Sequence, residues 1–145
     1  SQCIPDPGTL GGSDTRSRLL YLDGLDARAF EHVVRFADAE QATSAVGRLS
    51  RAFASCDPGD PAQVSVKDRG PVEEGPSEGV SQFVHASRTG TPVQASEISY
   101  YELGVTRADN VVVVLQWTSM GKPDTGSPWV FTGEMLITAT HRAVG

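Results

Sequence analysis

The clearest hydrophobic pattern lies between Ala29 and Cys56, where a period of two gives way to a helical period. From Ala29 to Phe36 the residues alternate between two faces, with Phe30, His32, Val34 and Phe36 on one and Glu31, Val33 and Arg35 on the other. Alternation of this kind is typical of a half-buried strand. The segment therefore predicts a β-strand.

A helix is predicted directly after this strand. Asp38 is suited to the N-cap, and Gln41 stands three residues on, where it can complete a capping box. The apolar stripe at spacings of three and four is Ala42, Ala45, Val46, Leu49, Ala52 and Phe53. The sequence Asp57-Pro58-Gly59 ends the helix near Cys56.

The second half of the chain predicts more strands. Segments that favour strands, beside a short strand or helical turn at 18–23, are 63–68, 80–87, 94–107 and 111–119. Residues 4–17 and 70–79 are rich in Pro and Gly and predict loops, the second of them acidic and mobile. Asp109-Asn110 predicts a two-residue hairpin turn. Valines on both faces of 111–119 indicate a central hairpin that is covered on both sides.

That hairpin supplies the candidate ligand site. With a two-residue turn, Glu102 faces Trp117, and Tyr100 lies next along the same face. A sheet face with aromatic and acidic side chains can line a ligand groove, to which we add His85 from a neighbouring strand. The alternative is that these aromatics only cover the sheet or pack on a helix. A register slip of one residue would exchange the two faces.

The last segment, 129–142, fits two structures. As a strand it alternates well, and pattern alone favours this. As a helix it has Ser127 as N-cap and Pro128 at the first position.

Size and charge limit the possible functions. The chain has 145 residues, which fits a single domain over 1–145, and a net charge of −6 without a basic stripe. Nucleic-acid binding needs clustered cations, so we do not expect it. The longest apolar run, Val111 to Leu115, is too short for a membrane span. The start Ser1-Gln2-Cys3 shows neither a signal peptide nor a lipobox, so we expect any targeting segment to have been removed.

The chain has two cysteines, Cys3 and Cys56. A disulfide between them would close a loop of about 54 residues and add roughly 4 kcal/mol on a chain-entropy estimate. It would tether residues 1–17 as an N-terminal arm in an oxidising compartment. The alternative is a pair of free buried thiols.

No catalytic or metal-binding motif stands out. No Ser lies in a Gly-x-Ser-x-Gly sequence, and the glycines at 8, 11 and 12 do not form a phosphate loop. Of the three histidines, His32 fits a hydrogen-bonded core position, and His141 fits a helix C-terminus. We expect no cofactor and no metal.

The segment from Val33 to Cys56, with Phe36, Phe53 and Cys56, resembles the PknH-like extracellular sensor domains of actinobacteria. The run Arg107-Ala108-Asp109-Asn110-Val111-Val112-Val113 is similar to a later strand of that family, and Cys3 is similar in placement to its upstream cysteine. The resemblance implies an α+β fold with an antiparallel sheet of about five strands, two helices and one disulfide. It favours a helix over 129–142.

The resemblance also implies an extracellular or membrane-tethered sensor without catalytic activity, secreted or lipid-anchored. Its ligand would be a small molecule or a cell-envelope component in a cleft lined by the sheet, with a membrane kinase or another envelope protein as partner. Two alternatives stay open. One is a small secreted hydrolase or isomerase that uses His85 or His32 with a carboxylate, and a His bonded to Asp, Glu or Ser in a concave site would favour it. The other is a protein-interaction module, favoured by an exposed flat edge at the late hairpin.

Overall fold

The computed structural model of the chain describes residues 6–22, 27–54, 64–74, 77–86, 99–120 and 128–145. The elements in chain order are a 3₁₀ turn, Pro7–Thr9, then β1 (Asp14–Leu22), β2 (Ala27–Arg35), α1 (Ala39–Ala54), β3 (Val64–Glu74), β4 (Ser77–Ala86), β5 (Ser99–Ala108), β6 (Val111–Met120) and α2 (Pro128–Val144). The predicted α+β class is confirmed.

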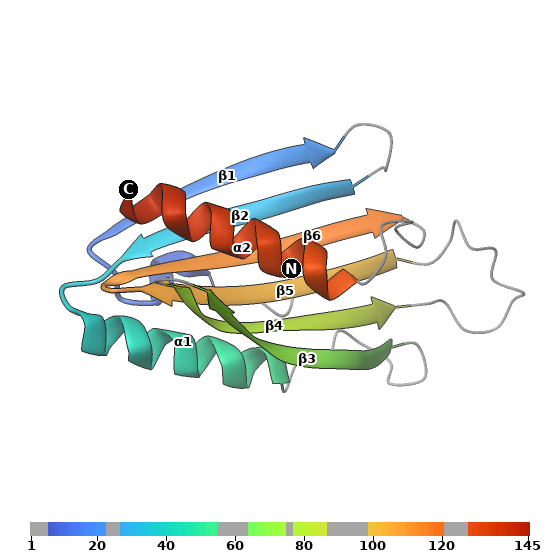
Figure 1. Cartoon of the computed structure of the whole chain (residues 1–145), viewed down its shortest axis with the longest axis horizontal. Helices are drawn as coiled ribbons and strands as arrows, with labels where there is room; N and C mark the ends of the chain where they lie inside the picture. Colours follow the sequence, from blue (N-terminus) through green and yellow to red (C-terminus); the bar gives the residue numbers. More distant parts are fainter. Residues whose placement is uncertain (1–5, 23–26, 55–63, 75–76, 87–98, 121–127) are drawn as a thin grey trace, which may run out of the picture.

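The six strands of the described part form one antiparallel sheet with the order β1-β2-β6-β5-β4-β3 (Figure 1). The prediction of about five strands was therefore one short. Part of the segment predicted as a loop over 4–17 is β1, and most of the acidic segment 70–79 is strand. Pro71 lies in β3 opposite Val80. A proline is tolerated there because β3 is an edge strand and needs no ladder on its outer side.

The two helices cover opposite faces of the sheet. On one face the stripe of α1 packs on strands β2, β5 and β6; the buried residues of this cluster are Leu10, Val34, Phe36, Ala42, Ala45, Leu49, Leu103, Val105, Val112 and Val114. On the other face α2 packs over a second cluster, which comprises Ala29, Val113, Leu115, Trp117 and Ala139. Figure 1 shows α2 crossing the sheet, with its C-terminal half over β2.

The central hairpin is as predicted. Ala108 pairs with Val111, and Glu102 pairs with Trp117. Asp109 has a φ of 50°, the left-handed conformation that Asp and Asn tolerate in a two-residue turn. Asn110 is bonded to the end of β2: its side chain donates to the Phe36 carbonyl at 2.8 Å, and its own carbonyl accepts from the Phe36 N–H at 2.8 Å. The turn thus holds the junction between β2 and α1.

Residues before β1 are packed against the rest of the domain. Arg48 of α1 donates to the Leu10 carbonyl at 2.9 Å, and the Ser13 N–H donates to the Arg35 carbonyl at 2.8 Å. The Asp38 cap is also confirmed, since its carboxylate accepts from the Gln41 N–H at 2.8 Å. Cys3 and Cys56 lie outside the described residues, so the disulfide stays a prediction.

The segment 129–142 is helical, as the start signals and the family resemblance indicated. Polar contacts between described residues join α2 to the sheet at two places. The hydroxyls of Thr106 and Thr140, both fully buried, lie 2.6 Å apart. Arg142 reaches Glu31 of β2. The C-terminal half of α2 is therefore joined to β5 and β2 by polar side chains as well as by apolar packing.

Candidate functional site

A groove of about 370 Å³ lies between the C-terminal half of α2 and the β1–β2 edge of the sheet. Its lining is dominated by charged side chains, with small apolar residues of α2 between them. The lining residues are Asp14, Arg16, Ser17, Arg18, Glu31, Val33, Arg35, Ala139, Arg142 and Ala143. The groove has this position because β1 is an edge strand and α2 crosses the sheet from β5 towards β2.

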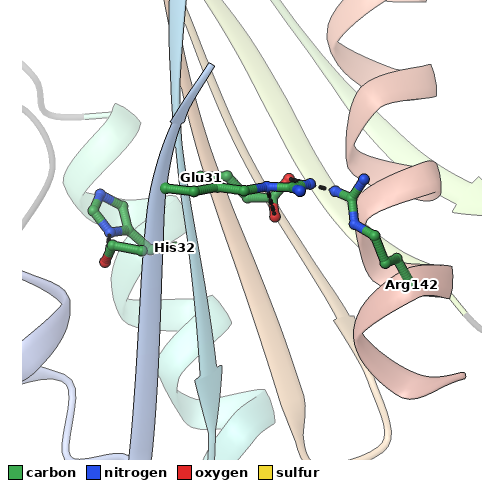
Figure 2. A network of polar contacts seen from close by, with 5 residues as sticks. Glu31, His32 and Arg142 are labelled. Atoms are coloured by element: carbon green, nitrogen blue, oxygen red, sulfur yellow. Dashed lines mark hydrogen bonds and ion pairs between the residues drawn. The ribbon is translucent and has the colours of Figure 1, made fainter.

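Glu31 is the centre of the charge network (Figure 2). Its carboxylate forms a bidentate pair with Arg18, from Nε to Oε1 at 2.9 Å and from Nη2 to Oε2 at 3.0 Å. Arg142 donates from Nη2 to the same Oε2 at 2.8 Å. One carboxylate thus joins the edge strand, its neighbour and the final helix.

Burial shapes the protonation of Glu31. The residue is only 5% exposed. Desolvation raises the pKa of Glu31 above its ordinary value, and the charge and hydrogen bonds of Arg18 act against that rise. Because both oxygens accept from guanidinium groups, the contacts stabilise the ionised form.

The other cations of the groove are less engaged. Arg16 pairs with Asp14 at 3.4 Å, in a contact whose side chains are both largely exposed. Arg35 is exposed, and among the described residues its side chain makes no hydrogen bond or ion pair. Four arginines against two carboxylates leave an excess of two positive charges in the lining. This is notable in a chain whose net charge is −6.

His32 lies on the opposite face of β2 from the groove (Figure 2). Its Nδ1 lies 2.6 Å from the Ser17 hydroxyl, with which it is paired across the strands. Burial lowers the pKa of His32, and the charge of Asp6 acts against that shift. The pair meets the hydrogen-bond part of the criterion for an enzyme, but the groove is on the other side of the sheet.

The strand register makes the predicted ligand residues neighbours in the sheet. Tyr100 pairs with His85, and Glu102 pairs with Trp117. Trp117 is 1% exposed and belongs to the core beneath α2, so its ring does not line an open groove in this structure. The side chains of His85, Tyr100 and Glu102 are outside the described part, and their role in binding stays a prediction.

The charged groove was not predicted from the sequence. Its members are Arg18, Glu31 and Arg142, and no pattern joins residues so far apart in the chain. One signal was available, because Glu31 shares its strand face with Ala29 and Val33, both apolar. A carboxylate on a covered face needs a cation beside it.

The described residues contain no group of three or more His, Cys, Asp or Glu side chains placed to hold a metal ion. Among the same residues no helix is both long enough and apolar enough to span a membrane. The late hairpin is central in the sheet, so it offers no exposed edge of the kind that would favour an interaction module.

Comparison with solved structures finds a similar fold in the extracellular domain of a protein kinase. The extracellular domain of PknH from Mycobacterium tuberculosis superposes with a TM-score of 0.59 at 12% sequence identity, over 92% of this chain and 67% of that chain. No family model matches the chain. A search of the curated proteins gave no significant match. At this identity the likeness concerns the α+β fold alone.

Proposed function

We propose that this chain is a ligand-binding domain without catalytic activity. The observation that carries the proposal is the groove beside α2, in which a buried carboxylate is held between two arginines while further arginine donors remain open. Preformed hollows with a few convergent polar groups are typical of ligand sites. Ser17 is the one lining residue paired with a base among the described residues, and its partner His32 lies on the other face of β2.

We infer that the domain acts outside the cytoplasm, as a sensor for a small molecule or a cell-envelope component. Its fold is similar to a domain described as extracellular. A disulfide between Cys3 and Cys56 would suit that compartment. On this proposal a membrane kinase or another envelope protein would be the partner that receives the signal.

A small hydrolase is the second candidate, and the short contact between Ser17 and His32 favours it. A serine bonded to a histidine is the first requirement for an activated nucleophile. Ser17 lines the groove, but its hydroxyl contacts His32 on the opposite face of the sheet, and Ser17 is exposed on an edge strand. Incubation with activated esters, comparing the protein with its Ser17→Ala variant, tests this candidate.

The experiment for the main proposal combines two measurements. Native mass spectrometry of the protein from its own host reports a bound small molecule and the state of both thiols. Backbone amide shifts on addition of that molecule, or of hits from a fragment library, then locate the site. We expect shifts in β1, β2 and the last turns of α2. Hits that cluster on the α1 face instead, or turnover of a ligand, would contradict the proposal.

A further inference from the structure

We propose that the groove binds a dianionic oxyanion group, of which a phosphate monoester is the best chemical match. This inference rests on the proposed function and specifies its ligand class. The first step is charge. The lining holds Arg16, Arg18, Arg35 and Arg142 against Asp14 and Glu31, an excess of two positive charges. A phosphate monoester carries about −1.5 to −2 at pH 7, so it would neutralise that excess.

The second step concerns the N–H donors that Glu31 does not occupy. The Glu31 carboxylate accepts from Nε and Nη2 of Arg18, but only from Nη2 of Arg142. Arg142 therefore keeps donors for a ligand, and Arg35 has no side-chain partner among the described residues. Both residues line the same hollow, one from α2 and one from β2. Guanidinium groups match the planar, paired geometry of phosphate oxygens.

The third step is the role of Glu31. Without it, four guanidinium groups around one hollow would repel each other. The buried carboxylate fixes Arg18 and Arg142 from behind, and so positions them before any ligand arrives. Glu31 is thus a positioning residue in this proposal. Because its contacts already order the arginine side chains, less side-chain entropy is lost when a ligand binds.

The test uses three ligands of similar size and decreasing charge: phenyl phosphate, phenyl sulfate and phenol. Titrations at constant ionic strength, followed by amide shifts and calorimetry, give each affinity. We expect saturable binding of phenyl phosphate with shifts in β1, β2 and α2. The affinity for the monoanionic sulfate should be about tenfold weaker, a difference of about 1.4 kcal/mol in binding free energy, because the sulfate leaves one positive charge of the lining without a counter-charge. Phenol should bind more weakly still.

The matched variants are Arg35→Gln and Arg51→Gln. Both remove one positive charge, but Arg51 lies in the last turn of α1, away from the groove. Arg35→Gln should weaken phenyl phosphate about tenfold with little change in the free energy of unfolding, whereas Arg51→Gln should leave the affinity within twofold. Glu31→Gln should weaken binding even though it adds net positive charge, because the arginines lose their support.

Several results would overturn the inference. Equal affinities for phenol and phenyl phosphate would leave the groove as a ligand site and remove the anion assignment alone. Equal effects of the two arginine variants would show that only overall charge is measured. Absence of saturable binding by all three ligands refutes the oxyanion site, and the proposed function is then judged separately, by whether the molecule found by native mass spectrometry maps to the groove.

Discussion

The network at Glu31 makes a prediction about stability that depends on which arginine is removed. Arg18 provides two of the three nitrogen contacts to the buried carboxylate, and Arg142 provides one. Their side chains are 39% and 50% exposed, so solvent screens both. After Arg142→Met both oxygens still accept from Arg18, and we expect a loss of about 1 kcal/mol. After Arg18→Met one oxygen loses its guanidinium partner, and we expect about 2 kcal/mol.

The double variant is the decisive case. Without either arginine, the carboxylate is buried with no cation beside it, which costs about 3–5 kcal/mol in comparable settings. The double loss should therefore exceed the sum of the single losses, by up to about 2 kcal/mol. Urea denaturation followed by tryptophan fluorescence measures it, since Trp117 lies beneath α2.

A matched control repeats the cycle in the Glu31→Gln background. There the coupling should shrink to a few tenths of a kcal/mol, because half-exposed arginines can be hydrated without a partner. Strict additivity in the native background, or a larger loss for Arg142→Met than for Arg18→Met, would refute the account of Glu31 as a buried charge shared by two cations.

Three further predictions concern the packing and titration of the domain. A Cβ at Gly12 would overlap with Val34 and come 2.9 Å from the β2 backbone; Gly12→Ala should therefore cost about 1–3 kcal/mol, while Gly47→Ala in α1, where there is room, should stabilise by up to about 1 kcal/mol. The pKa of His32 is lowered from 6.5, so its contribution to the free energy of unfolding is present above 6.5 and is lost as pH falls through the lowered value. A difference curve between the protein and His32→Asn measures that slope, and parallel curves would contradict it. Asp38→Ala should cost about 1 kcal/mol through loss of the α1 cap; an unchanged urea midpoint would count against the observed N–H contact.

Local patterns predicted most of the fold. The Asp38 cap, the stripe of α1 and the hairpin turn at Asp109-Asn110 all depend on residues within a few positions of each other. Such signals act through backbone preference and amphipathicity, which a sequence displays directly. The start of β1 and the second half of β3 were missed because they lie in segments rich in Pro and Gly, which normally indicate loops. In an edge strand such as β3, the missing N–H of a proline and the missing side chain of a glycine destabilise the sheet less than in a central strand.

The candidate site was harder to predict, for a physical reason. The aromatic face around Trp117 has the composition of a ligand groove, but α2 lies on it and makes the ring part of the core. Which face a helix covers depends on tertiary packing between distant segments. The same holds for Glu31, whose partners come from another strand and from the last helix. The residue types therefore indicated which groups could bind a ligand, but not whether those groups are accessible to solvent.

The order of strands has a consequence for how the chain folds. β2 pairs with β6 along its whole length, from Arg35 with Val111 to Ala27 with Ser119. During synthesis from the N-terminus, the pair of β1 and β2 therefore has no further partner strand until β6, which ends at Met120, has been made. Two strands alone are marginal in water, and their open edge invites pairing with other chains. Folding should be slow for this size and sensitive to chaperones, because its defining contacts are so non-local.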